Sequence, residues 1–276
     1  MRGFKKNWLV LAAGLLIIII TIGAIFAPLL APYPFDLQDP ERILSPPDMG
    51  HIMGTDRLGR DLFSRIIYGS RVSLSIGFFT ALSALIIGTL YGAVSGYAGG
   101  RLDNIMMRGV DVIYALPDLL LIILITIMIG RGVTGIFLAL SIMSWMTIAR
   151  LIRGEVLRIK EMPYIEAERA IGAGDGRILL YHILPNTLGP LIVTLTFRIP
   201  AAILAESTLS FIGLGISPPF ASWGTLANDG WTTLRFYPHL IVFPGITIFL
   251  TILSFNFIGD WIGDRLDPQR RERRAA

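Results

Sequence analysis

Acidic and basic side chains crowd into one polar segment, residues 164–186, which separates two long apolar stretches of the chain. Its charged residues are Glu166, Glu168, Arg169, Asp175 and Arg177. Charged side chains are costly to place in hydrocarbon, yet this segment keeps the spacing of a helix. We therefore expect a polar helix that lies outside a membrane and is bound there by another protein, with simple anchoring at the membrane surface as the alternative.

The same segment predicts where that helix begins and ends. Pro163 suits the first turn of a helix, and Glu166 and Glu168 follow near the positive end of its dipole. A narrow apolar stripe comes next at helical spacing, made of Ala167, Ala170 and Ile171. Gly172 then permits the chain to turn. We expect a short helix at about residues 163–176.

Four other polar residues are notable because of where they lie. Arg198 and Glu206 fall within one apolar stretch, eight residues apart and therefore on roughly one face of a helix. Ionisable groups inside a membrane line a pathway or pair with each other, and both interpretations stay open. Asp229 and Trp231 lie between apolar stretches, where they could contact a protein partner or belong to a solvated turn.

The sequence lacks the residue patterns of an enzyme or a metal site. The chain has no cysteine, and its histidines, His51, His182 and His239, are too scattered to indicate a metal site. Residues 172–176 read Gly-Ala-Gly-Asp-Gly, but they follow no predicted strand and lack the lysine of the Walker A pattern. We predict no catalytic residue, metal or cofactor in this chain.

Composition indicates the class of protein. Of the 276 residues, 53% are hydrophobic and only 16% are charged, and the mean hydropathy is +0.65. Soluble domains carry roughly a quarter charged residues. Apolar stretches long enough to cross a bilayer predict an all-α polytopic protein with six transmembrane helices, at residues 8–31, 72–97, 112–129, 133–149, 187–212 and 240–259. Pro28 spoils the best cleavage site in the first stretch, so we expect a retained anchor rather than a signal peptide.

The lysine and arginine residues predict the orientation. All three lysines and most arginines fall on the side that holds both termini and residues 164–186. The positive-inside rule therefore places that side in the cytoplasm. The net charge of +4 reflects this topology rather than a nucleic-acid surface, because the basic residues do not alternate with aromatic ones.

The predicted organisation has three parts. Residues 1–31 hold the N-terminal tail and first span, residues 32–71 form a long extracytoplasmic segment, and residues 72–276 form a core with five spans and the polar helix. The extracytoplasmic segment starts with many proline and acidic residues, which favours an irregular loop. From Asp61 onward, apolar residues alternate with arginines at helical spacing, which predicts an amphipathic helix at the membrane interface.

Small residues recur every fourth position in the second span, at Gly69, Ser73 and Gly77 and again at Gly88, Gly92 and Gly96. Such spacing lets helices approach closely in lipid. It indicates close packing within the bundle or against a partner membrane subunit.

The polar segment resembles a known motif. Glu166-Ala167-Glu168, three residues, Gly172, nine residues and His182-Ile183-Leu184-Pro185 resemble the EAA motif of ABC importer permeases, which reads E-A-A, three residues, G, nine residues and I-x-L-P. Glu168 and His182 depart from it. Residues 54–77, 206–224 and 255–268 are similar to further signatures of the C-type permease of the di- and oligopeptide branch. Together these stretches cover most of the chain.

The resemblance implies a type I ABC importer permease fold and a mechanism. The polar helix would be the coupling helix between spans 4 and 5, docked on an ATPase subunit, with Glu166, Ala167, Glu168, Gly172, His182, Leu184 and Pro185 in the coupling region. The implied partners are a second related permease, two ATPase subunits that bind ATP and Mg²⁺, and an extracytoplasmic binding protein that delivers peptide. The implied location is the cytoplasmic membrane of a bacterium or archaeon. Nickel or a chelated metal is the alternative substrate, and glutathione and sugar-oligomer importers also share this family.

Overall fold

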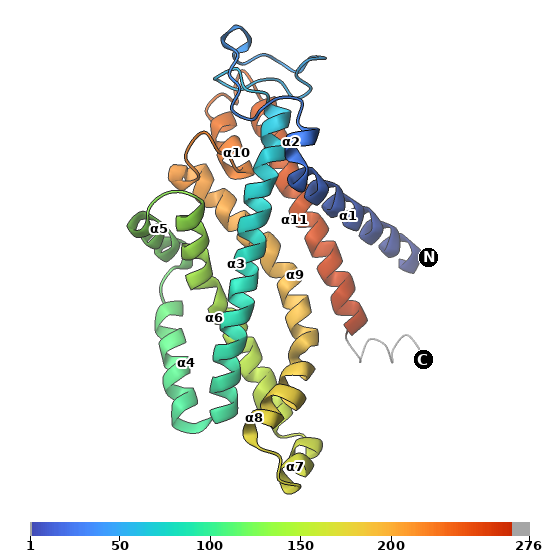
Figure 1. The fold of residues 1–276 in the computed structure, drawn as a ribbon, viewed down its shortest axis with the longest axis vertical. Coiled ribbons are helices and arrows are strands. Elements are labelled where there is room, and N and C mark those ends of the chain that lie inside the picture. The colour runs from blue at the N-terminus through green and yellow to red at the C-terminus, as the bar shows by residue number, and fades with distance from the viewer. Residues whose placement is uncertain (1, 267–276) are drawn as a thin grey trace.

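The computed structural model describes residues 2–266, with side chains from residue 8 onward, as a bundle of helices (Figure 1). The helices are α1 (Arg2–Ile25), α2 (Ala27–Leu30), α3 (Leu62–Ala98), α4 (Gly100–Tyr114), α5 (Asp118–Ile129), α6 (Val133–Lys160), α7 (Pro163–Ala170), α8 (Asp175–Arg177), α9 (Leu184–Leu209), α10 (Trp223–Trp231) and α11 (His239–Leu266). A short 3-10 helix (η1, Pro40–Arg42) and two π-helical segments (η2, Ile178–Ile183; η3, Ser210–Leu214) complete them. The predicted cytoplasmic arginines beyond residue 266 lie outside the described residues.

Five helices of the described part are long and apolar enough to cross a membrane, and a bent pair could supply a sixth crossing. The five are α1, α3, α6, the continuous stretch from α8 to η3, and α11. The bent pair is α4 and α5, whose axes differ by 85°. The single span predicted at residues 112–129 is therefore broken. Pro117 is the physical reason, because proline disfavours helix at the preceding residue and adopts extended backbone here.

The interfacial helix expected from Asp61 onward is also different in the structure. Asp61 caps the start of α3, accepting a hydrogen bond from the Ser64 backbone N–H at 2.7 Å. From there α3 runs unbroken for 37 residues. Its first turns are covered by protein rather than by a membrane surface: Leu62 and Arg65 are almost fully buried.

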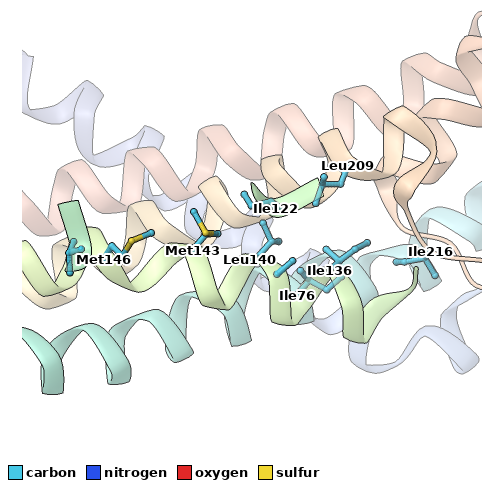
Figure 2. Close-up of a cluster of buried hydrophobic side chains, with 10 residues drawn as sticks. Ile76, Ile122, Ile136, Leu140, Met143, Met146, Leu209 and Ile216 are labelled. Carbon is cyan, nitrogen blue, oxygen red and sulfur yellow. The ribbon is translucent and has the colours of Figure 1, made fainter. Parts of the chain in front are cut away.

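Helix α3 is the centre of the bundle and packs against α6 and α9. A methyl group at Gly88 or Gly92 would collide with the α6 backbone. The repeated small residues therefore serve packing within this chain. Beside this contact, apolar side chains of α3, α4, α5, α6, α9 and the segment after η3 form a core cluster (Figure 2), made of Ile76, Val110, Ile122, Ile136, Ala139, Leu140, Met143, Met146, Leu209 and Ile216.

The two ends of the bundle differ in construction. Residues 32–61 and α10 gather at one end of the bundle, and we call these residues together the cap. Elements α7, α8 and η2 project from the opposite end (Figure 1), and we call this segment the α7 loop. The cap is tied to the bundle by long-range hydrogen bonds, such as that from the Trp223 indole N–H to the Ile66 carbonyl at 3.1 Å. These two ends hold most of the predicted site residues.

Candidate functional site

The α7 loop contains the helix predicted from residue 163. Pro163 occupies the first turn of α7, and Glu166 also lies in that turn, near the positive end of the dipole. The helix ends at Ala170, earlier than the predicted residue 176. Gly172 explains the end, because its φ of +86° is a conformation that favours glycine.

One side of α7 faces the protein and the other is open. Ile165 is fully buried, and it packs with Ile178 and Ile183 of the following segment and with α6. Glu166 and Ala167 are exposed, and Ile171 is 79% exposed. An apolar residue so exposed on a short projecting element is a feature of interaction surfaces.

The two positions that depart from the EAA pattern lie next to each other. His182 Nε2 is 3.6 Å from Glu168 Oε2, which connects η2 to the last turn of α7. Leu184 and Pro185 then open α9, and Asn186 Nδ2 donates to the His182 carbonyl at 2.6 Å. The coupling residues predicted from the sequence thus form one continuous region of the structure.

Glu206 is fully buried near the end of α9. Its carboxylate accepts hydrogen bonds from Ser210 Oγ at 2.7 Å and from Ser73 Oγ at 3.1 Å. Ser73 in turn accepts from the Trp223 backbone N–H at 3.2 Å. Glu206 therefore joins α3, α9 and the cap through hydroxyl groups. Ser73 comes from a distant part of the chain and had no signal in the sequence, whereas Ser210 lies one helical turn after Glu206 and is a local partner.

Arg198 is not joined to Glu206. Eight helical residues separate the two by about 12 Å along the α9 axis, and Glu206 has the hydroxyl partners described above. Arg198 is partly buried instead, in a cavity of about 130 Å³ between α3, α5, α6 and α9, where Tyr114 and Asp118 are also lining residues. Two side chains on the same face of a helix form a pair only if they also lie close together along the helix axis, and Arg198 and Glu206 do not.

The cap holds a cluster of ion pairs that the sequence analysis missed. Asp56 accepts from Arg60 Nε at 2.8 Å and is paired with Arg65, and all three are buried. Asp229 of α10 lies 3.7 Å from Arg65. Burial raises the pKa of the Asp229 carboxyl, although the nearby arginines oppose this. Trp231 is 55% exposed and contacts Phe211 edge to face.

No described residues form a group of three or more histidine, cysteine, aspartate or glutamate side chains that could hold a metal ion.

Comparisons with known proteins place the chain in a family. Residues 88–272 match the model of the binding-protein-dependent transport system inner membrane component, and residues 1–47 match the N-terminal transmembrane domain of oligopeptide transport permease C. The Bacillus subtilis dipeptide transport system permease protein DppC is 45% identical over 98% of this chain and 85% of its own length. The oligopeptide permease OppC of the same bacterium is 41% identical, over 99% of this chain and 89% of its own.

A further relative has another named substrate. The glutathione transport system permease protein GsiD of Pectobacterium atrosepticum is 40% identical, over 97% of this chain and 89% of its own.

Solved structures agree on the fold. The chain resembles a subunit of the MetNI methionine ABC transporter in an inward-facing conformation, with a TM-score of 0.60 and 18% identity over 75% of this chain and 98% of that one. It also resembles a chain of an amino acid ABC transporter solved with histidines, with a TM-score of 0.55 and 20% identity over 74% and 93% of the two chains. The fold is thus that of a type I ABC importer permease, and the chain belongs to the family of binding-protein-dependent transport system inner membrane components.

Proposed function

We propose that this chain is the permease subunit of an ABC importer for di- and oligopeptides. The observation that carries the proposal is the near full-length identity to a dipeptide and an oligopeptide permease. The relatives described above are named for a dipeptide, an oligopeptide and glutathione, which is itself a small peptide. This favours peptide over nickel as the substrate.

In the proposed orientation, the α7 loop and both termini face the cytoplasm and the cap faces outward. The distribution of lysine and arginine supports this orientation. The α7 loop is then on the side where ATP is available. The cap is on the side where a binding protein would arrive with its ligand.

The α7 loop would couple this subunit to an ATPase. The exposed face of α7, with Glu166, Ala167 and Ile171, would lie in a cleft of the ATPase, while Ile165 holds the helix to the bundle. Movement of the docked helix would pass to α9 through η2, because Ile178 and Ile183 are buried beside Ile165. Two ATPase subunits would bind ATP and Mg²⁺, one on this chain and one on a second, related permease.

The translocation path would run between the two permease subunits. Arg198 is a candidate lining residue, since its cavity also contains Asp118, next to the break between α4 and α5. A structural role for Arg198 is the alternative.

Purification of the intact complex with its binding protein tests the proposal. We expect peptide-loaded binding protein to stimulate ATP hydrolysis and to drive peptide uptake into liposomes, and nickel to do neither. The same assays with glutathione distinguish an importer restricted to this tripeptide from an importer of peptides in general. Stimulation by nickel alone would contradict the proposed substrate, and passive flux through this chain without ATPases would contradict the importer mechanism.

A further inference from the structure

The cap contains a cavity of about 440 Å³ that the proposed function does not explain. Its walls come from the loop at residues 56–60, the segment at residues 213–220, α10 and Arg131 in the connection between α5 and α6. The volume lies within the range of small-molecule sites. Neutral polar side chains, Ser217 and Asn228, also line it.

The charges around this cavity are unbalanced. Its lining holds four arginines, Arg57, Arg60, Arg65 and Arg131, but only two carboxylates, Asp56 and Asp229. The Asp56 carboxylate already accepts hydrogen bonds from the side chains of Arg60 and Arg65 and from the backbone N–H groups of residues 58 and 60. Asp229 lies at 3.7 Å from Arg65, too far for a hydrogen bond. The cavity therefore carries an excess of two positive charges.

Arg65 supplies independent evidence that an acceptor is missing. Only 3% of this residue is exposed, and its Nε–H has no hydrogen-bond partner. Buried donors are nearly always paired, and a guanidinium left partly unpaired in a dry site is costly. Arg57 and Arg131, by contrast, are exposed and stand at the rim of the cavity.

We propose that this cavity binds the carboxylate of a short peptide that enters the importer from the cap side. The inference rests on the proposed function and names the group recognised. Guanidinium groups bind carboxylates through two parallel hydrogen bonds. Arg131 is exposed and able to adjust to such a ligand, whereas Arg57 already donates a hydrogen bond to Thr232 Oγ1. A single acidic side chain of a binding protein would leave most of the volume unfilled, whereas a peptide end would also bring amide groups to Ser217 and Asn228.

Uptake by the reconstituted complex, driven by loaded binding protein, tests this site. One peptide is compared with its C-terminal amide, each at equal measured occupancy of the binding protein. The wild type is expected to transport the carboxylate form about tenfold faster, as one charged hydrogen-bonded contact can provide. Arg131→Gln should remove most of this preference by slowing the carboxylate form alone, and Arg131→Lys should restore part of it.

Arg235→Gln is the matched control, because Arg235 is an exposed arginine of the same end that does not line the cavity. It should keep the wild-type preference. Equal slowing of both peptide forms by Arg131→Gln, or an altered KM for the loaded binding protein with unchanged preference, would overturn the carboxylate site and indicate contact with the binding protein. Failure of the wild type to transport any peptide would instead contradict the proposed function.

Discussion

The cap and the α7 loop are both rich in charge, but they use it in opposite ways. In the cap, Asp56, Arg60 and Arg65 are buried and bonded to one another. In the α7 loop, Glu166 and Arg177 are exposed, and the elements are held together by buried isoleucines. Charge in the cap therefore serves mainly the fold and a binding cavity, whereas charge in the α7 loop is available to a partner.

This difference makes stability and transport separable. A mutation in the cap network removes interactions that the folded chain makes with itself. A mutation on the open face of α7 removes no buried contact of the isolated subunit. Variants in each of the two regions test that separation.

Replacing Asp56 with alanine should unfold the cap. The variant leaves two buried guanidinium groups without their shared carboxylate, and breaking a buried pair in this way costs about 3–5 kcal/mol. We expect a large fall in thermal stability of the purified protein in detergent, together with low yield. Asp36→Ala is the control, because Asp36 is an exposed carboxylate of the same segment; it should change the free energy of unfolding by less than about 0.5 kcal/mol. A stable Asp56→Ala variant would show that the network does not hold the cap.

Glu166→Lys should abolish transport while leaving the subunit folded and inserted. The side chain is exposed in the first turn of α7, so the reversal of charge alters the docking face and the contact with the helix dipole. Uptake by the complex and copurification of the ATPase measure the result. Glu161→Lys makes the same charge change just before α7, at another exposed position, and should transport normally. Normal uptake by Glu166→Lys would mean that α7 is only a surface anchor.

The sequence predicted the α7 loop better than the cap. The helix start at Pro163 and the turn at Gly172 depend on local chemistry, so both could be expected from the residues alone. The burial of Arg65 could not, because it depends on a loop that folds back over the first turns of α3. Alternating apolar and basic residues look the same whether lipid or protein covers them.

A pair between Arg198 and Glu206 was one of two interpretations of their shared helix face, the other being a pathway role, and the sequence alone could not decide between them. Helical spacing predicts a shared face, but the actual partners of Glu206 come from Ser73 on α3 and Ser210 in η3. The Ser73 contact depends on how distant helices pack, whereas Ser210, four residues after Glu206, is a local partner. The bend at Pro117, by comparison, had a visible signal in the proline itself.

Glu206→Ala should have an intermediate effect. It leaves the Ser73 and Ser210 hydroxyls without their acceptor in a buried site, at a cost of about 1–3 kcal/mol. Glu206→Gln keeps one carbonyl acceptor and should be closer to wild type. Thermal unfolding of both variants in detergent measures this order, and Thr208→Ala, at a half-buried position of the same helix, controls for general effects. Equal stability of the alanine and glutamine variants would show that the hydroxyl contacts do not hold the cap to the bundle.

The smallest expected effect concerns the pH dependence of the cap. Burial raises the pKa of Asp229 above its usual value of 3.8, with Asp56 acting in the same direction and Arg65, Arg60 and Arg57 opposing it. A carboxyl whose pKa is higher in the folded state binds protons more tightly there than in the unfolded state. Its contribution to stability is therefore present below pH 3.8 and is lost as the pH rises through the folded-state value.

Asp229→Asn removes this titration. The stability of the asparagine variant relative to wild type should accordingly be greatest at neutral pH and should shrink as the pH is lowered toward 4. Paired thermal unfolding curves at several pH values measure the difference, with Asp36→Asn as the control that should show no such trend. Because half of the Asp229 side chain is exposed to solvent, the shift is expected to be small. A difference of the opposite sign would mean that attraction to Arg65 outweighs burial, and that Asp229 belongs with the structural carboxylates of the cap rather than with the rim of its cavity.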